Sequence, residues 1–304
     1  MKKIFLLLIG LVVLGLYGSA LVSPIPSSID YDLEKSNLGK KLFFDSRLSK
    51  DSTISCVSCH DIYRSGDDGL KVAVGINGKE GIVNTPTVFN AVFNFAQNWD
   101  GSAKNLKEQA KGPITNPVEM GHNFDDLISE LSKDKNYQEE FKKLYNKKIS
   151  KELILDALFE FQKTLITPNA PFDRYLRGDE NAITPTQKEG YELFKSKGCI
   201  ACHNGINLGG QLFAKFGMVG LIDDKNLGLY NITKDEEDKY YFKVPTLRNI
   251  SKTAPYFHTG SVDTLYEAVE IMLYYQVGRE TSESEIEKIV EFLNSLDGEL
   301  PYGE

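Results

Sequence analysis

Two short motifs contain every cysteine of the chain. Residues 56–60 read Cys-Val-Ser-Cys-His, and residues 199–203 read Cys-Ile-Ala-Cys-His. The four cysteines are Cys56, Cys59, Cys199 and Cys202. Two thiols at this spacing can add to the vinyl groups of a haem, and the adjacent His60 or His203 can ligate its iron. A four-cysteine zinc site or a pair of redox disulfides would also use four thiols, but neither requires a histidine after each pair. The motifs therefore predict two covalently bound haem c groups.

The second axial ligand of each iron decides what that haem can do. A methionine stabilises ferrous iron and makes an electron-transfer site, whereas an empty position leaves room for chemistry. Met272 follows His203 and precedes the last expected helix, which is the order of ligands in single-domain cytochromes c. Met218 is an alternative much nearer to His203, and Met272 could instead be ordinary core filling. We predict that Met272 completes the second haem.

No methionine serves the first motif equally well. Met120 lies beside Glu119 in a segment that reads Asn-Pro-Val-Glu-Met-Gly, and His122 follows it. An acid in such a segment is typical of a distal pocket rather than of an electron-transfer site. From the residues alone, Glu119 could equally be a capped or salt-bridged surface acid.

The elements that must position these groups form a repeated pattern. Residues 38–43 and 189–194, upstream of the two motifs, both read x-Gly-x-x-Leu-Phe on an expected helix. The glycine would let another helix cross closely, and the Leu and Phe side chains would face the haem. Each half also ends in a helix, over 153–165 in the first and after the capping box Ser282 to Glu285 in the second.

These repeats predict a mainly α fold with long loops and little strand. It would consist of two cytochrome c-like haem domains in tandem, pseudo-duplicated, over residues 24–166 and 172–304. The haem itself would supply much of each core.

The first 23 residues predict export. Two lysines precede an apolar run from residue 4 to 16, and small residues precede a cleavage site near Ala20. The alternative is a retained N-terminal membrane anchor, because the apolar stretch is nearly long enough to span a bilayer. In both cases the folded part would be periplasmic, and we favour a cleaved signal peptide.

The composition excludes several other classes of protein. Charged residues make up 26% and apolar residues 41% of the 304 residues, as in a globular protein. The formal net charge is −8, so no basic surplus exists to bind nucleic acid. Four cysteines are too few for a scaffold held by disulfides.

Segments around the motifs resemble the bacterial di-haem cytochrome c peroxidase family over nearly the whole mature chain. They are residues 90–94, 99–101, 108–110, 116–121, 167–169, 171–178, 244–249 and 253–261. The resemblance implies that hydrogen peroxide, two electrons and two protons give two waters. The first haem would be peroxidatic, and the second, held by His203 and Met272, would be the high-potential site that receives electrons.

The resemblance also implies roles for single residues. Glu119 would be the acid–base that moves a proton between the two oxygens of peroxide. Gln109 would be its polar partner, which orients peroxide. Trp99 would lie between the haems and help electrons pass, although without the resemblance it would be taken for a core aromatic.

A calcium site follows from the same resemblance. Asn84 would give its side-chain oxygen, and Thr253 and Pro255 would give backbone carbonyls, at the domain interface. Such a mixed set of oxygens suits calcium. Arg248 and His258 would lie near haem propionates, although His258 could equally be a satisfied loop histidine.

One departure from the family pattern concerns the first haem. Many relatives carry a distal histidine that blocks this iron until the other haem is reduced. The matching position here is Ile76, which cannot ligate iron. We therefore predict a permanently open peroxidatic haem that needs no reductive activation, with His122 as the only other histidine near enough in sequence to replace the ligand.

Two other functions remain as alternatives. One is a di-haem enzyme that oxidises another protein, in which a tyrosine resembling Tyr274 or Tyr275 would replace Met272. The other is a non-catalytic di-haem electron carrier, which would gain nothing from an open iron. The partners expected of a peroxidase are hydrogen peroxide and a small electron donor, either a basic cytochrome c or a cupredoxin. A homodimer is also possible.

Overall fold

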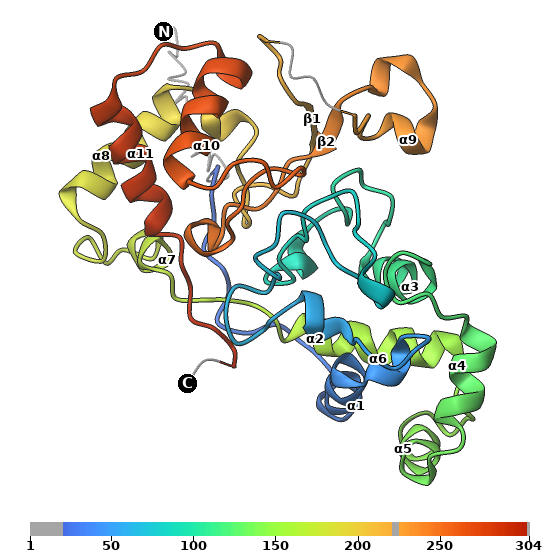
Figure 1. Ribbon diagram of the computed structural model, residues 1–304. Helices are drawn as coiled ribbons and strands as arrows, with labels where there is room; N and C mark the ends of the chain where they lie inside the picture. The colour runs from blue at the N-terminus through green and yellow to red at the C-terminus, as the bar shows by residue number, and fades with distance from the viewer. Residues whose placement is uncertain (1–20, 221–224, 303–304) are drawn as a thin grey trace, which may run out of the picture.

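The computed structural model describes residues 21–220 and 225–302, which form two helical lobes side by side (Figure 1). Within these residues the only sheet is the antiparallel pair β1 (Phe213–Lys215) and β2 (Tyr241–Lys243), in which Ala214 is opposite Phe242. The predicted mainly α class with little strand is therefore confirmed.

Six helices build the first lobe. They are α1 (Leu33–Phe44), α2 (Cys56–Cys59), α3 (Leu106–Thr115), α4 (Phe124–Leu131), α5 (Lys135–Tyr145) and α6 (Lys151–Lys163). Their apolar faces enclose one core, in which Leu42, Phe141 and Phe161 are fully buried. The helix expected over 153–165 is α6, displaced by two residues.

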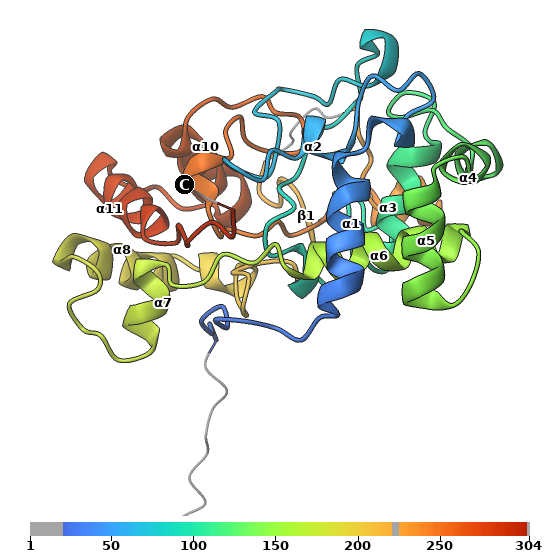
Figure 2. The same ribbon diagram turned by 90° about the horizontal axis from the view of Figure 1, so that it is seen from below.

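Five further helices belong to the second half of the chain. They are α7 (Pro171–Leu176), α8 (Pro185–Ser196), α9 (Tyr230–Thr233), α10 (Leu265–Ile271) and α11 (Glu283–Asn294). The expected capping box is present at α11, where Ser282 and Glu285 bond reciprocally. Figure 2 shows α8, α10 and α11 grouped apart from α1, α3 and α6.

The repeated glycines lie where two long helices cross. A Cβ added to Gly39 of α1 would be 1.9 Å from the Ala157 carbonyl oxygen of α6. A Cβ added to Gly190 of α8 would be 1.9 Å from the Lys288 carbonyl oxygen of α11. The predicted close crossings are therefore confirmed in both halves, and they are equivalent.

The aromatic and aliphatic residues of the repeat differ in position. Phe43 and Phe194 lie on the walls of the two large cavities, as expected for haem contacts. Leu42 and Leu193 do not line either cavity and pack among the helices instead. The expectation for the leucines was wrong because the helix crossing takes up their side of the helix.

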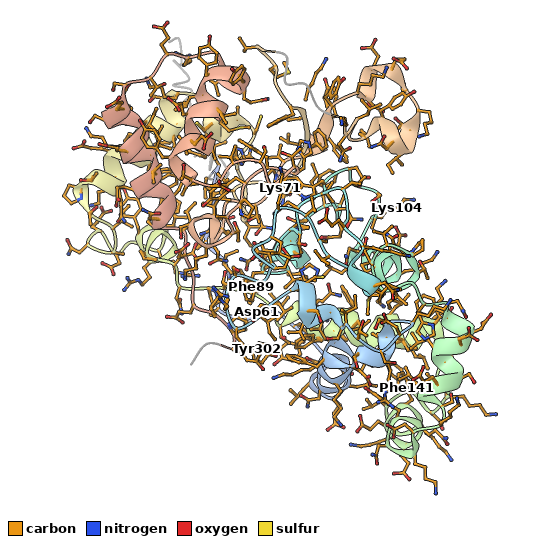
Figure 3. The ribbon with its side chains drawn as sticks, viewed as in Figure 1. Asp61, Lys71, Phe89, Lys104, Phe141 and Tyr302 are labelled. Carbon is orange, nitrogen blue, oxygen red and sulfur yellow. The ribbon has the colours of Figure 1, made fainter. Side chains whose placement is uncertain are left out.

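The N-terminal end of the described chain packs against the second lobe, and the C-terminal end packs against the first. Val22 pairs with Gly205 in a parallel bridge and is 3% exposed within the core of the second lobe. Val22 therefore belongs to the folded part of the protein, although it lies within the range 1–23 of the predicted signal peptide or anchor. At the other end, Tyr302 lies against the first lobe (Figure 3), with its ring centroid 6.0 Å from that of Phe161 and 4.0 Å from Lys40 Nζ.

The predicted signal peptide or anchor spans residues 1–23, and its residues 1–20 lie outside the described residues. Among the residues that the structure does describe, no helix is long and apolar enough to cross a membrane.

Candidate active site

Each Cys-x-x-Cys-His motif forms a short helical turn at the edge of a cavity. The first is helix α2, whose reciprocal cap joins Ser55 and Ser58. The second is a 3₁₀ turn at Cys199–Ala201. All four cysteines are described, and none forms a disulfide. Burial raises the pKa of the Cys199 thiol to about 11, so this sulfur is uncharged near neutral pH.

Both motif histidines are oriented by a backbone carbonyl. His60 Nδ1 is 3.1 Å from the Gly66 oxygen, and His203 Nδ1 is 3.2 Å from the Leu208 oxygen. Burial lowers the pKa of both rings, that of His203 to about 4, so each imidazole is neutral and donates its Nδ1 proton. Nε2 is then left unprotonated and able to bind iron, as in a haem site. The residues present therefore fit two haem c groups.

The first cavity has a volume of about 600 Å³ and brings together the residues predicted for peroxide chemistry. Cys56, Cys59 and His60 lie on its wall together with Glu119 and Gln109. Gln109 comes from α3, and Glu119 comes from the loop after it. The structure thus places the predicted acid and the predicted amide beside the first haem motif.

The carboxyl of Glu119 is held by a residue that the sequence analysis left unassigned. Asn116 Nδ2 donates to Glu119 Oε1 at 2.7 Å, while its own Oδ1 accepts from the Val118 amide at 3.0 Å. Burial raises the pKa of Glu119, and the hydrogen bond from Asn116 opposes that rise. The only signal for Asn116 was its spacing of three residues from Glu119.

Ile76 packs against the same loop and away from the cavity. It is 5% exposed, its amide donates to the Glu119 carbonyl at 2.8 Å, and its Cδ1 lies where a side chain on Gly121 would go. Neither Ile76 nor His122 is among the residues that line the cavity. His122 Nδ1 accepts from the Asn123 amide at 2.9 Å.

Met120 shares that wall but belongs to the core of the lobe. It is 4% exposed within the first core cluster. His60 is therefore the only histidine on the described wall of this cavity.

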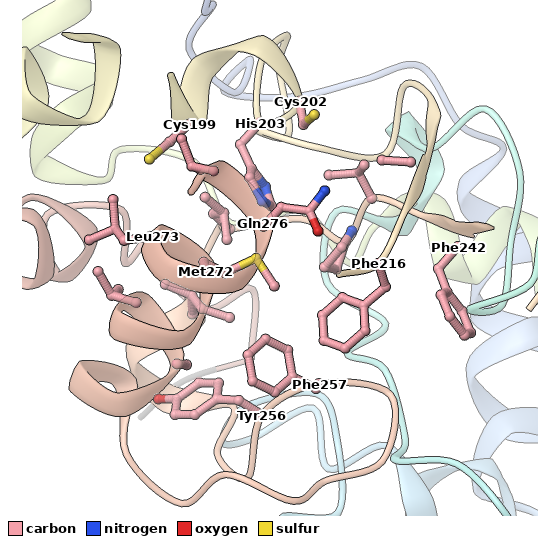
Figure 4. A pocket seen from close by; sticks show the side chains of 18 of the residues that line it. Cys199, Cys202, His203, Phe216, Phe242, Tyr256, Phe257, Met272, Leu273 and Gln276 are labelled. Carbon is pink, nitrogen blue, oxygen red and sulfur yellow. The ribbon is translucent and has the colours of Figure 1, made fainter. Parts of the chain in front are cut away.

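A second cavity of about 190 Å³ contains the second motif. Cys199, Cys202 and His203 line it together with Met272, and Figure 4 shows His203 and Met272 extending into the same space. Met272 begins a π-helical segment, Met272–Val277, that continues α10. The competing Met218 is 61% exposed and does not line this cavity.

A third cavity of about 90 Å³ lies between the other two. Asn84, Thr253 and Pro255, the residues predicted for calcium, all line it. Asn84 Nδ2 donates to the Leu70 carbonyl at 2.9 Å, so its Oδ1 is on the other branch of the amide. Trp99 borders all three cavities, and its Nε1 donates to the Asn84 carbonyl at 2.9 Å.

The two residues predicted near propionates have different surroundings. His258 lines the second cavity and stacks on Phe242, with ring centroids 4.1 Å apart. Arg248 lies outside all three cavity walls. Its Nη1 is 2.7 Å from Asp173 Oδ1, and its Nε donates to the Ile206 carbonyl at 3.0 Å. The propionate role of Arg248 stays a prediction.

Comparison with known proteins gives matches over both halves. The family description "Di-haem cytochrome c peroxidase" matches residues 33–181, and "Cytochrome c" matches residues 187–297. The cytochrome c peroxidase Ccp of Escherichia coli is 50% identical over 283 residues, which cover 91% of this chain and 61% of that protein. The cytochrome c551 peroxidase of Nitrosomonas europaea is 43% identical, with 92% of this chain and 85% of that protein covered.

A solved structure agrees with the fold. A MauG-like protein associated with microbial copper homeostasis superposes with a TM-score of 0.80 at 27% identity, covering 92% of this chain and 94% of that one. These matches confirm the predicted tandem of haem c domains and the predicted class of enzyme, a peroxidase.

Proposed function

Because the chain belongs to the di-haem cytochrome c peroxidase family, we propose that it reduces hydrogen peroxide to water with electrons from a small donor protein. The observation that carries this proposal is the first cavity, where a buried acid and an amide share a wall with a haem motif. Two electrons and two protons convert one peroxide into two waters.

Glu119 is the proton-transfer group in this reaction. A bound haem supplies the iron that binds peroxide and delivers electrons. Ionised Glu119 takes the proton from the inner oxygen and returns it to the outer oxygen, which leaves as water. Asn116 holds one carboxylate oxygen, so the other is directed to the substrate. Gln109 hydrogen-bonds peroxide from α3.

The second cavity receives the electrons in this proposal. His203 and Met272, which line this cavity, would hold the haem iron, and the wall around them is mainly aliphatic and aromatic. Neither Tyr274 nor Tyr275 lines this cavity, and Tyr274 is 59% exposed. This arrangement favours a peroxidase over the related enzymes in which a tyrosine would take the place of Met272. Trp99, on the wall of both haem cavities, lies on the route to the first haem.

A haem held by His60 would be accessible to peroxide in the resting protein. The Ile76 amide donates to the Glu119 carbonyl, His122 Nδ1 accepts from the Asn123 amide, and neither residue lines the first cavity. Asn84, Thr253 and Pro255, which line the third cavity, would hold a calcium ion. The protein acts in the periplasm, where a small cytochrome c or a cupredoxin is the electron donor.

Steady-state peroxide reduction tests this function. The fully oxidised holoenzyme and the same enzyme reduced by one electron are assayed with a reduced small cytochrome. We expect equal turnover without a lag, and a loss of at least ~100-fold in Glu119→Gln, the lower range for a general acid–base. Gln138→Glu, on the remote helix α5, serves as a surface control that keeps wild-type turnover.

The possible outcomes separate the claims. A lag that pre-reduction abolishes would keep the peroxidase but overturn the open first haem. A purely low-spin first haem in the oxidised state would do the same. Absence of turnover in both states would overturn the peroxidase itself and favour the protein-oxidising or electron-carrier alternatives.

A further inference from the structure

A buried lysine lies on the wall shared by the second cavity, proposed to hold the second haem, and the third cavity, proposed to hold calcium. Lys243 ends strand β2 and is 6% exposed, and it lines both of these cavities. Its backbone amide donates to the Trp99 carbonyl at 2.8 Å, so strand β2 and Trp99 are held side by side.

The ammonium of Lys243 has no carboxylate partner among the described residues. None of their ion pairs includes it, although most other buried charges in the described part of the chain are paired, as Arg248 is with Asp173. Burial lowers its pKa to about 8, with no acid to oppose the effect. A buried charge without a counter-ion is costly, so this position calls for an anion from outside the polypeptide.

We propose that Lys243 is a positioning residue whose ammonium pairs with haem propionate carboxylates where the second and third cavities meet. This inference rests on the haem binding proposed above. Each haem c carries two propionates, so a haem bound at the Cys-x-x-Cys-His motif would bring carboxylates into this cavity. The pair would neutralise both partners in a site that water reaches poorly.

The same contact has a consequence for electron flow. A positive charge near the iron stabilises the ferrous state relative to the ferric state, because the ferric haem carries one more positive charge. Lys243 therefore raises the reduction potential of the second haem and helps it to accept an electron from the donor. The backbone amide of Lys243 is hydrogen-bonded to the Trp99 carbonyl, so its charge is held close to the proposed electron route between the haems.

The experiment is a potentiometric titration of the holoenzyme, followed by its haem absorption bands. Lys243→Met removes the charge and keeps a long apolar side chain, and Lys243→Arg keeps the charge. Lys215→Met is the matched control, because Lys215 lines the same cavity from β1 but is exposed. The reading needs no peroxide, so it is independent of whether the protein is a peroxidase.

We expect Lys243→Met to lower the ratio of reduced to oxidised second haem about tenfold at a fixed ambient potential, or ~59 mV for one electron. Lys243→Arg and Lys215→Met should stay close to wild type. An unchanged potential in a fully loaded Lys243→Met protein would overturn the proposal, as would an equal shift in Lys215→Met. If Lys243→Met does not fold, a wild-type potential in Lys243→Gln would overturn it in the same way.

Discussion

Glu119 and Asn116 form the contact on which proton transfer in the proposed reaction depends. Partial burial raises the pKa of the carboxyl, while donation from Asn116 stabilises its ionised form. Burial and the hydrogen bond from Asn116 shift the pKa of Glu119 in opposite directions, so their balance sets the pH range of the proposed activity.

Asn116→Ala should move the acid limb of the pH profile. Glu119 accepts a proton only when ionised, so kcat/KM falls as the pH drops through its pKa. Removing Asn116 destabilises the ionised form, raises that pKa further, and shifts the limb to higher pH. The measurement is kcat/KM for peroxide against pH. Asn123→Ala, which removes the cap of α4, is the control, and an unmoved limb in Asn116→Ala would contradict the assignment.

At the scale of elements, one helix pair is used twice. Helices α1 and α6 in the first lobe cross as α8 and α11 do in the second, and a glycine lies at each crossing. The close approach brings Phe43 and Phe194 to the cavity walls. Each haem motif is therefore positioned by a rigid pair of helices rather than by loops alone.

Gly39→Ala should destabilise the first lobe by about 3 kcal/mol, the upper range for overpacking, because its Cβ would collide with the α6 backbone. Gly81→Ala is the control, since an added Cβ makes only ordinary contacts with Ala73, at 3.4 Å or longer, and Gly81 lines none of the three cavities. That control should be neutral or stabilise by about 1 kcal/mol, because alanine restricts the unfolded chain. Denaturant unfolding of the holoprotein measures both, and equal stability of the two variants would refute the role of the crossing.

At the scale of the molecule, the two lobes are joined by exchanged ends and by shared cavities. Val22 enters the second core, and Tyr302 covers the first. Trp99 borders both haem cavities and the small cavity between them. A single side chain thus spans the boundary that an electron must cross in the proposed reaction.

Trp99→Phe should separate the two electron-transfer steps. Reduction of the second haem by the donor should keep its rate, while passage to the first haem slows by roughly tenfold, or ~1.4 kcal/mol in the barrier. Stopped-flow absorption resolves the two haems. Tyr256→Phe, on the second and third cavities but not the first, should behave as wild type. Slowing of the first step instead would place the effect of Trp99 at donor binding.

Features that depend on local spacing could be predicted before the structure was known. The two Cys-x-x-Cys-His motifs, the helix that follows the Ser282 capping box and the repeated glycines could be predicted because their partners lie within a few residues or one helix face. Glu119 and Met272 line the cavities that contain the two motifs, and their roles as acid–base and iron ligand stay predictions.

Contacts between residues that are far apart along the chain could be learned only from the folded structure. Lys243 reaches the space beside Trp99, and Val22 reaches the far lobe, although nothing in their local sequence indicates it. Isoleucine has no atom that can ligate iron, so the sequence already excluded Ile76 as a ligand. Its packing against Gly121 depends on how two loops fold together. Such contacts join segments that are remote along the chain, and burial and charge act through space rather than along the sequence.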